Sequence, residues 1–570
     1  MKRILQTTLL TACLVGVSLG AYHAALPPDP ELSRYVPTGA LLYLQAKDFS
    51  ELLSDWDKSR EKEQWIKSKN YEIFLQSSLL LRLHDAGGEF SKAAGVPADD
   101  AILHQVAGKQ TAFALYDIGK LEFLYITRVP SSGVTQSALW QSRSKFETRT
   151  AGGVNFYYRA DAESGREVAF AQAGDYLILT TRQDLMASAL QLIASNGSGG
   201  HSIEEEAWWR RPVAASGEPG DLRMVLNLEK IVPTPYFRSY WIQRNVTDMR
   251  QYSSAISDLT RSGGEYREER LLFKKTVAPQ DASADRGSAA VADLLRLVPA
   301  NAGIYEAKAN PAPKYSLDAL TVKILAPHFG PPAPEKLAPQ VYLGNGETGL
   351  GSDLETRIDE VASQNPAPAE NKKSQEIKSS LEQLLERQKI LAQLQMQRTE
   401  RDSAGVFVRI RSMITFSAES DWNEREVQAA LTDFIRPGLT SGQLGVSWKS
   451  ASGYSVLDGI WPLAITVRGK YLTISEDPAF LSEVIANFNQ KTSAPSAAFV
   501  AGFHHQNERE NFASLMKLLN TGSQSSSWPD FFSENIASLS FSLRNVSSEK
   551  IQVRDAPDRQ TQSVTYEWTR

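Results

Sequence analysis

Two stretches of the chain, 174–193 and 469–488, carry the same pattern of apolar and polar positions. In the first stretch, Tyr176–Leu179 is a continuous apolar run of strand length, which is typical of a strand covered on both faces. Apolar residues then recur at helical spacing, at Leu185, Ala189 and Leu192. The second stretch has apolar residues at matching places: Phe480, Leu481, Val484, Ile485 and Phe488. Both stretches therefore predict a buried strand, a turn and an amphipathic helix on one core.

Further matches occur in the same order along the chain. Tyr35-Val-Pro-Thr-Gly-Ala-Leu-Leu-Tyr43 resembles Leu297-Val-Pro-Ala-Asn-Ala-Gly-Ile-Tyr305. The strands expected over 254–261 and 267–275 match 536–541 and 563–568. Because the order is kept, we predict an internal duplication. The expected divisions are an N-terminal segment (1–26), a first repeat (27–279), a polar linker (280–292) and a second repeat (293–570).

The second repeat carries an insertion, 362–402, that has no counterpart in the first. Within it, Ser374–Arg401 is rich in Glu, Gln and Leu and predicts a helix. Its apolar stripe consists of Ile377, Leu381, Leu384, Leu385, Leu391 and Leu394. Such a helix suits a coiled coil or a docking surface, and it suits packing within the chain equally well.

Each repeat mixes strands that are neighbours in sequence with helices at their edges. This order favours an α+β fold with largely antiparallel sheets over a doubly wound parallel sheet. A length of 570 residues is too great for one hydrophobic core, so two or more domains are expected.

Net charge and cysteine content narrow the classes of function. The formal net charge is -5, which gives no basis for a nucleic-acid partner. The single cysteine, Cys13, lies in the N-terminal apolar segment. The rest of the chain therefore has no internal disulfide and no thiol catalysis, and its lack of thiols suits an oxidising envelope compartment.

The N-terminus has the pattern of an export signal. Lys2 and Arg3 precede a mostly apolar run, Ile4–Leu19, and small residues allow cleavage before Ala21. Two alternatives stay open. The apolar run is long enough to remain as a membrane anchor if it extends to Leu26. The sequence Leu-Thr-Ala-Cys13 also resembles a lipobox, which would attach a lipid to that cysteine.

Together, these features resemble an uncharacterised family of exported bacterial proteins that is known only as a domain of unknown function. The resemblance rests on the export segment, the opening Val-Pro-x-x-Ala-x-x-Tyr strand, the repeated strand before a helix, and the final Tyr566-Glu567-Trp568. It covers most of residues 35–570 and implies a bacterial cell-envelope protein. It implies no activity and supplies no catalytic residue.

Motifs with chemical meaning are few. Gly344-Asn-Gly-Glu-Thr-Gly349 fits the letters of a dinucleotide fingerprint, but a proline-rich approach and a following linker favour a turn and a capped helix. His504 and His505, near Glu508 and Glu510, form the best metal-like cluster. Adjacent histidines on a strand point to opposite faces, so a polar pair at a strand end is the favoured interpretation. We predict no catalytic residue, no cofactor site and no metal site.

Two aromatic groups are the candidates for partner binding: Trp208, Trp209, Tyr236, Phe237, Tyr240 and Trp241. The first two lie in an expected loop that is absent from the second repeat, where exposure would make them a sticky patch. The other four lie near one face of an expected helix, which suits a membrane surface or a partner. Packing of that helix on the sheet is the alternative.

The resulting prediction is a non-enzymatic binding or scaffold protein of the cell envelope. The first alternative is a carrier of a lipid or another apolar ligand, and the second is an unrecognised hydrolase. Exposure of the Trp208 loop and the inserted helix would favour a protein partner. A continuous apolar cavity between sheet and helices would favour an apolar ligand, and convergent polar side chains in one cleft would favour a hydrolase. Membrane contact through the N-terminal segment is also expected.

Overall fold

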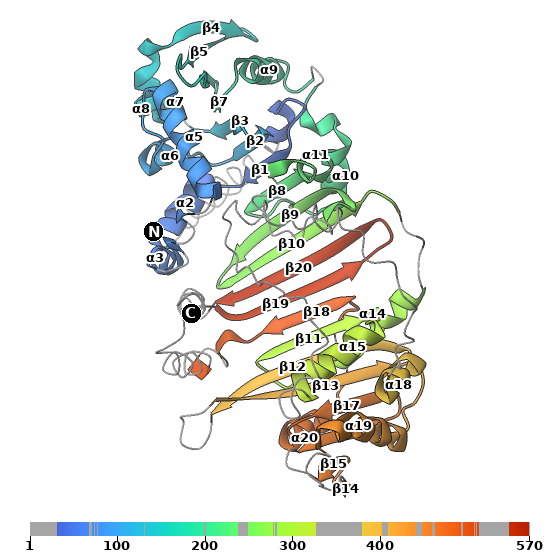
Figure 1. Ribbon diagram of the computed structural model, residues 1–570. Helices are drawn as coiled ribbons and strands as arrows, with labels where there is room; N and C mark the ends of the chain where they lie inside the picture. Colours follow the sequence, from blue (N-terminus) through green and yellow to red (C-terminus); the bar gives the residue numbers. More distant parts are fainter. Residues whose placement is uncertain are drawn as a thin grey trace, which may run out of the picture.

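The computed structural model describes residues 31–568, apart from 68–70, 73–74, 77, 130, 199–200, 237–248, 278, 280–281, 326–378, 402–407, 440–446, 459–461, 492–493, 507, 509 and 512–545. Its strands form one 20-stranded sheet that runs through the whole molecule (Figure 1). Every strand pairing among the described residues is antiparallel. Helices flank the sheet, so the chain has the predicted α+β fold.

The first ten strands form one half of the sheet. In chain order they are β1 (Leu42–Ala46), β2 (Thr111–Asp117), β3 (Glu122–Arg128), β4 (Glu147–Ala151), β5 (Val154–Ala160), β6 (Glu167–Ala173), β7 (Tyr176–Thr180), β8 (Leu222–Asn227), β9 (Tyr252–Ser262) and β10 (Glu265–Lys274). Across the sheet they lie in the order β4, β5, β6, β7, β3, β2, β1, β8, β9 and β10.

The last ten strands form the other half. They are β11 (Ile304–Ala309), β12 (Ile390–Arg401), β13 (Val408–Ala418), β14 (Ser447–Ala451), β15 (Tyr454–Asp458), β16 (Leu463–Arg468), β17 (Tyr471–Ser475), β18 (Phe499–Phe503), β19 (Val546–Asp555) and β20 (Arg559–Trp568). They repeat the pairing order of the first half, strand for strand. The final strands of the two halves, β10 and β20, pair with each other and join the sheet. The repeated order agrees with a duplication, which itself remains a prediction.

Helices cover both halves of the sheet (Figure 1). Those described in the first half are α2 (Phe49–Lys58), α3 (Arg60–Ile66), α5 (Ser78–Ala94), α6 (Asp100–Val106), α7 (Ser131–Gln136), α8 (Ala138–Gln141), α9 (Gln183–Ala194), α10 (Ala207–Ala215) and α11 (Leu228–Ile231). Those described in the second half are α14 (Ala282–Leu295), α15 (Pro313–Leu320), α18 (Ser380–Gln388), α19 (Glu424–Leu439) and α20 (Pro478–Asn487). Short 3-10 turns lie at Leu32–Tyr35, Ser142–Lys145 and Ile203–Glu205, and a π turn lies at Thr321–Leu325.

The two organising stretches form the predicted strand and helix in each half, as β7 with α9 and β17 with α20. Both strands begin after a glycine with positive φ, Gly174 at 58° and Gly469 at 55°. Such turns favour glycine because a Cβ atom is strained there. In the second half, Asp477 accepts hydrogen bonds from Ala479 N and Phe480 N and so caps α20.

Alternate residues of the central strands enter two different cores. In β3, Leu124 and Ile126 pack with α9 and α10, whereas Tyr125 packs on the opposite face beneath α5–α8. The second half divides in the same way, with α14 and α20 on one face and α15, α18 and α19 on the other. Because helices cover both faces of these strands, side chains on both faces are buried. This explains why the strands are continuous apolar runs.

The helix predicted over Ser374–Arg401 is wrong for its C-terminal half. Helix α18 ends at Gln388, Lys389 adopts a left-handed conformation, and β12 follows between β11 and β13. Within β12, Ala392, Leu394 and Met396 enter one core at the period of two that defines a strand. The sequence Ala392–Gln397 alternates apolar residues with glutamine, which is a strand signal that the helix prediction missed, and the glutamines Gln393 and Gln395 are themselves buried.

The linker predicted over 280–292 is also wrong. Residues 282–295 form α14, whose Val291 and Leu294 are fully buried against the second sheet half. Small residues such as Ala and Ser made this segment resemble a spacer, although they also suit close packing of a helix on a sheet. The partner of β20 in the last hairpin is β19, whereas the segment predicted for that role, 536–541, lies outside the described residues.

No helix in the described part of the chain is long and apolar enough to cross a membrane. The predicted export segment, 1–26, lies outside the described residues, so cleavage, anchoring and lipid attachment stay predictions.

Candidate functional site

An apolar cavity of about 680 Å³ lies between the sheet of the first half and helices α5 and α6. These helices lie beside β2 and β3, on the left of the upper half in Figure 1. The floor is built from alternate residues of neighbouring strands, because only every second side chain points to one face. Its main apolar contributors are Leu44, Phe113, Leu115, Phe123 and Leu179.

The roof of the cavity is formed by one apolar face of α5 and one apolar face of α6. Helix α5 contributes Leu83, Ala86, Gly87 and Phe90, which share one face at helical spacing. Helix α6 contributes Ile102, Leu103 and Val106. The carboxylate of Asp99 accepts a hydrogen bond of 3.0 Å from Ile102 N and caps α6. Leu83 lines the cavity and is still 44% exposed, so the cavity opens to solvent beside it.

Polar groups in the inner wall of the cavity are already satisfied. The Tyr125 hydroxyl donates to the Val106 carbonyl oxygen at 2.9 Å. Burial, outweighing nearby threonine hydroxyls, raises the pKa of Tyr125 to about 12, so the phenol stays neutral. The hydroxyls of Thr111 and Thr127 lie 2.6 Å apart and bond to each other. The inner end of the cavity therefore suits an apolar ligand without unmet polar groups.

The rim carries one buried charge, Arg166, whose side chain is 8% exposed. Its Nε and Nη2 donate to Glu89 Oε2 at 3.2 and 2.5 Å, and its Nη1 donates to the Lys120 carbonyl oxygen at 2.5 Å. Because Glu89 lies on α5 and Lys120 lies between β2 and β3, this guanidinium ties the roof to the sheet. A buried arginine held by a carboxylate is the expected arrangement for a desolvated charge.

In the equivalent layer of the second half, α15, α18 and α19 cover the sheet, and the inward side chains of α18 are buried: Leu381, Leu384 and Leu385. The open space in the first half is bordered by α5, including Gly87, whose position has no atom within 4 Å of an added Cβ.

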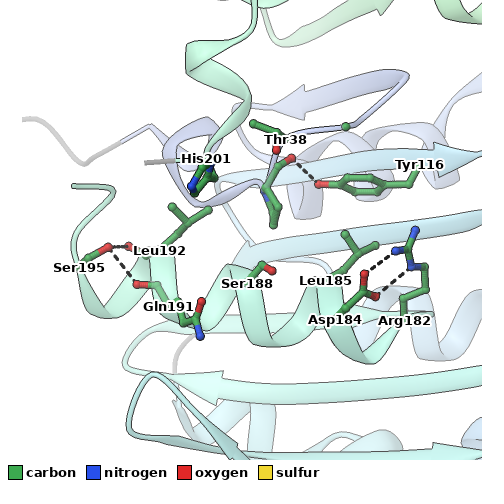
Figure 2. A pocket seen from close by; sticks show the side chains of 12 residues that line it. Thr38, Tyr116, Arg182, Asp184, Leu185, Ser188, Gln191, Leu192, Ser195 and His201 are labelled. Carbon is green, nitrogen blue, oxygen red and sulfur yellow. Dashed lines mark hydrogen bonds and ion pairs between the residues drawn. The ribbon is translucent and has the colours of Figure 1, made fainter. Parts of the chain in front are cut away.

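A second, polar cavity of about 680 Å³ lies along α9 (Figure 2). Some of its polar groups are already paired. The Tyr116 hydroxyl donates to the Pro37 carbonyl oxygen at 2.8 Å, and Arg182 is paired with Asp184. Burial, with the Glu206 charge as a smaller cause, raises the pKa of Tyr116 well above its usual range. The hydroxyl of Ser188 and the side-chain amide of Gln191 also line this cavity.

The loop predicted around Trp208 and Trp209 is wrong, and the condition for a patch there, exposure, is not met. Both side chains lie on α10, are 9% and 5% exposed, and belong to the core beneath α9 and α10. The Trp209 ring meets the fully buried Tyr43 ring edge-on, with centroids 4.6 Å apart. The loop was predicted from surrounding Gly and Pro clusters, but Pro212 lies within the helix and is itself buried.

The remaining aromatic candidates are placed only in part. Tyr236 is 39% exposed, and an added Cβ at Gly119 would collide with its ring. The other three residues, Phe237, Tyr240 and Trp241, lie outside the described part of the chain. The glycine pattern over 344–349 also lies outside it.

The metal-like histidines do not converge. His504 and His505 follow the end of β18, and the His504 ring lies 2.7 Å from the Ala302 carbonyl oxygen. Glu508 is buried elsewhere and accepts hydrogen bonds from the backbone and hydroxyl of Thr399. His504 and Glu508 therefore make local contacts, and His505 Nε2 lies 3.8 Å from a carboxylate oxygen of Glu549.

Among the described residues, one group has metal-compatible spacing: Asp57, Asp100 and His104. All three are exposed. Lys62 already pairs with Asp57, and burial does not restrict access to the group. The described histidine rings have other neighbours: His504 lies beside a backbone carbonyl oxygen and His104 beside the Asp57 carboxylate.

Comparisons with known proteins identify no family for this chain. No protein-family model matches the chain, and no curated protein matches it. Crystal form I of TP0453 is similar at 13% identity with a TM-score of 0.23, covering 44% of this chain and 82% of TP0453. Crystal form III covers 49% of this chain and 90% of its own, also at 13% identity and a TM-score of 0.23. Such a score carries no argument about function. The resemblance to domain of unknown function 3352 stays a prediction.

Proposed function

We propose that this protein binds and carries an apolar or single-chain lipid ligand in the cavity beneath α5 and α6. The observation that carries the proposal is the cavity itself, with an apolar floor and roof and an open end beside Leu83. Its volume of about 680 Å³ lies within the range of roughly 300–1,000 Å³ typical of small-molecule sites.

The burial of Trp208, Trp209 and the leucines of α18 supports this choice over a protein scaffold. A docking role needed Trp208 and Trp209 to be exposed, and both are buried. It also needed the inserted helix to present its leucines, whereas those of α18 lie in the core. The predicted condition for an apolar ligand, a cavity between sheet and helices, is met in the first half.

The same proposal includes a location for the protein, the bacterial cell envelope. Support comes from the export pattern at Lys2–Leu19, the absence of cysteine after Cys13, and the family resemblance. A carrier in that compartment would shield an acyl chain from water, which is worth about 0.8 kcal/mol for each buried methylene group.

Two glycines in α5 allow a matched test. Gly87 lines the cavity and Gly88 does not, and neither has an atom within 4 Å of an added Cβ. The variants Gly87→Leu and Gly88→Leu therefore change helix propensity equally without a direct clash. A leucine at Gly87 would occupy the space of a few methylene groups, costing a ligand about 2–3 kcal/mol.

The experiment uses the full chain after lipid removal, with the fluorescent fatty acid cis-parinarate as probe. We expect saturable binding, a loss of affinity of roughly 30-fold or more in Gly87→Leu, and little change in Gly88→Leu. Native mass spectrometry before lipid removal should show a co-purifying lipid at fixed stoichiometry. Absence of saturable binding, or equal effects of both variants, would refute the carrier proposal.

A further inference from the structure

A polar chamber of about 480 Å³ adjoins the apolar cavity, and Arg166 and Thr181 line both. The two spaces therefore meet at these side chains. A ligand that fills the cavity and reaches its rim would have an apolar tail and a polar head. The head would lie against a guanidinium and a hydroxyl that are themselves almost completely buried.

The hydrogen bonds at this junction leave donors unused. A guanidinium has five N–H groups. Arg166 uses three of them, two toward Glu89 and one toward the Lys120 carbonyl oxygen. Two N–H groups therefore have no acceptor among the described residues. Thr181 Oγ1 accepts from Phe123 N at 2.9 Å, and the proton of its hydroxyl likewise has no acceptor in the described part of the chain.

The carboxylates of the chamber, in contrast, already have partners. Glu89 is held by Arg166, and Glu122 by Arg182 at 3.2 Å. Glu167 accepts from Gln183 N at 2.9 Å. Glu89, Glu122 and Asp184 are thus ion-paired with arginines, and a cationic headgroup attracted to Glu167 would still have to approach the charge of Arg166. An acceptor headgroup would instead satisfy buried donors that are otherwise unmet.

We infer that the ligand is a single-chain amphiphile whose headgroup presents acceptor oxygens, a carboxylate or a phosphate monoester, to Arg166 and Thr181. This inference rests on the proposed carrier function and adds the chemistry of the headgroup. Charge-assisted hydrogen bonds from a buried guanidinium set the orientation of the ligand, with its tail beneath α5 and its head at the junction.

The test compares probes of sixteen carbon atoms each on the delipidated full chain. Palmitate, hexadecyl phosphate and hexadecylammonium displace cis-parinarate, and their relative affinities are measured. We expect palmitate or hexadecyl phosphate to bind at least about tenfold more tightly than the ammonium, the effect of one charge-assisted hydrogen bond. The order of palmitate and hexadecyl phosphate distinguishes the two headgroup sources.

A paired variant tests the role of Arg166. Arg166→Gln with Glu89→Gln removes both charges together, so no lone charge stays buried. We expect the preference for acceptor headgroups to fall below about threefold while cis-parinarate still binds. Gly87→Leu should weaken all probes alike and keep their ratio.

The outcomes separate the two proposals. Binding of all three probes with equal affinity by the native chain would overturn the headgroup inference and leave the carrier function standing. A preference that persists in the paired variant would overturn the assignment to Arg166. Failure of every probe to bind would overturn the carrier function and the headgroup inference together. The comparison on the native chain needs no variant, so a folding defect in the paired variant cannot obscure it.

Discussion

Replacement of Trp209 by alanine tests the correction that α10 is a core helix. The Trp209 side chain is 5% exposed, and its ring meets Tyr43 edge-on at 4.6 Å. Tyr43 lies on β1 and is fully buried, so the contact joins α10 to the centre of the first sheet half. The substitution removes the indole and leaves a cavity between them.

The expected cost follows from this burial. Truncation of a buried tryptophan to alanine costs about 3–5 kcal/mol, a figure that includes the lost edge-on contact. Trp56 offers a matched control in the same half of the molecule, because its side chain on α2 is 44% exposed. Trp56→Ala should change the free energy of unfolding by no more than about 0.5 kcal/mol.

Urea titration followed by far-ultraviolet circular dichroism measures both variants without relying on tryptophan fluorescence. For a slope of about 1–3 kcal/mol per molar urea, Trp209→Ala should lower the midpoint by roughly 1 M or more. A loss smaller than about 1 kcal/mol would show that Trp209 is not packed in the core. An equal loss in Trp56→Ala would also contradict the packing argument, because the exposed ring would then matter as much as the buried one.

Three further predictions concern other parts of the sheet. Gly303→Ala should cost about 1–3 kcal/mol in urea titrations, because the new Cβ would overlap buried Glu508, whereas Gly217→Ala meets nothing and should be neutral. Burial raises the pKa of Glu268, but bonds from its arginine and serine neighbours outweigh burial and hold it below its usual range. Its contribution to stability is therefore present above about pH 4.5 and lost in more acidic solution, so Glu268→Gln should flatten the acid side of the pH–stability curve. Leu394→Ala should cost about 2–5 kcal/mol by urea titration, because that side chain is fully buried in the strand that replaces a predicted helix.

The repeated strand and helix could be predicted because local signals agreed with the tertiary environment. Tyr176–Leu179 and the matching run of β17 are apolar on both faces, and both faces are covered. The glycine before each strand marked its start, and its positive φ explains why. At β7 and β17 the length of the apolar run, its pattern and the preceding glycine turn all predict a buried strand, and the structure has a strand there.

The failures have a common physical cause, which is that packing overrode local sequence preference. The alternation over Ala392–Gln397 is visible in the sequence, but the content of Glu, Gln and Leu over Ser374–Arg401 favours a helix, and the segment forms a strand between β11 and β13. Pro212 lies inside α10, where it is buried with Trp208 and Trp209. In both segments, tertiary packing determined the secondary structure. A single sequence does not show which distant strands will pack against a segment.

The cavity could not be predicted because it depends on space that side chains leave empty. The only sequence signal was the pair Gly87-Gly88 inside a helical stripe, where glycine costs about 1 kcal/mol relative to alanine. Neither position is constrained by a close neighbour. The glycines are thus not required by packing, whereas the described helix α18 of the other half buries Leu381, Leu384 and Leu385 against the sheet. The strand order is the same in both halves, so the side chains of the covering helices, and not the sheet topology, determine whether such a space is left.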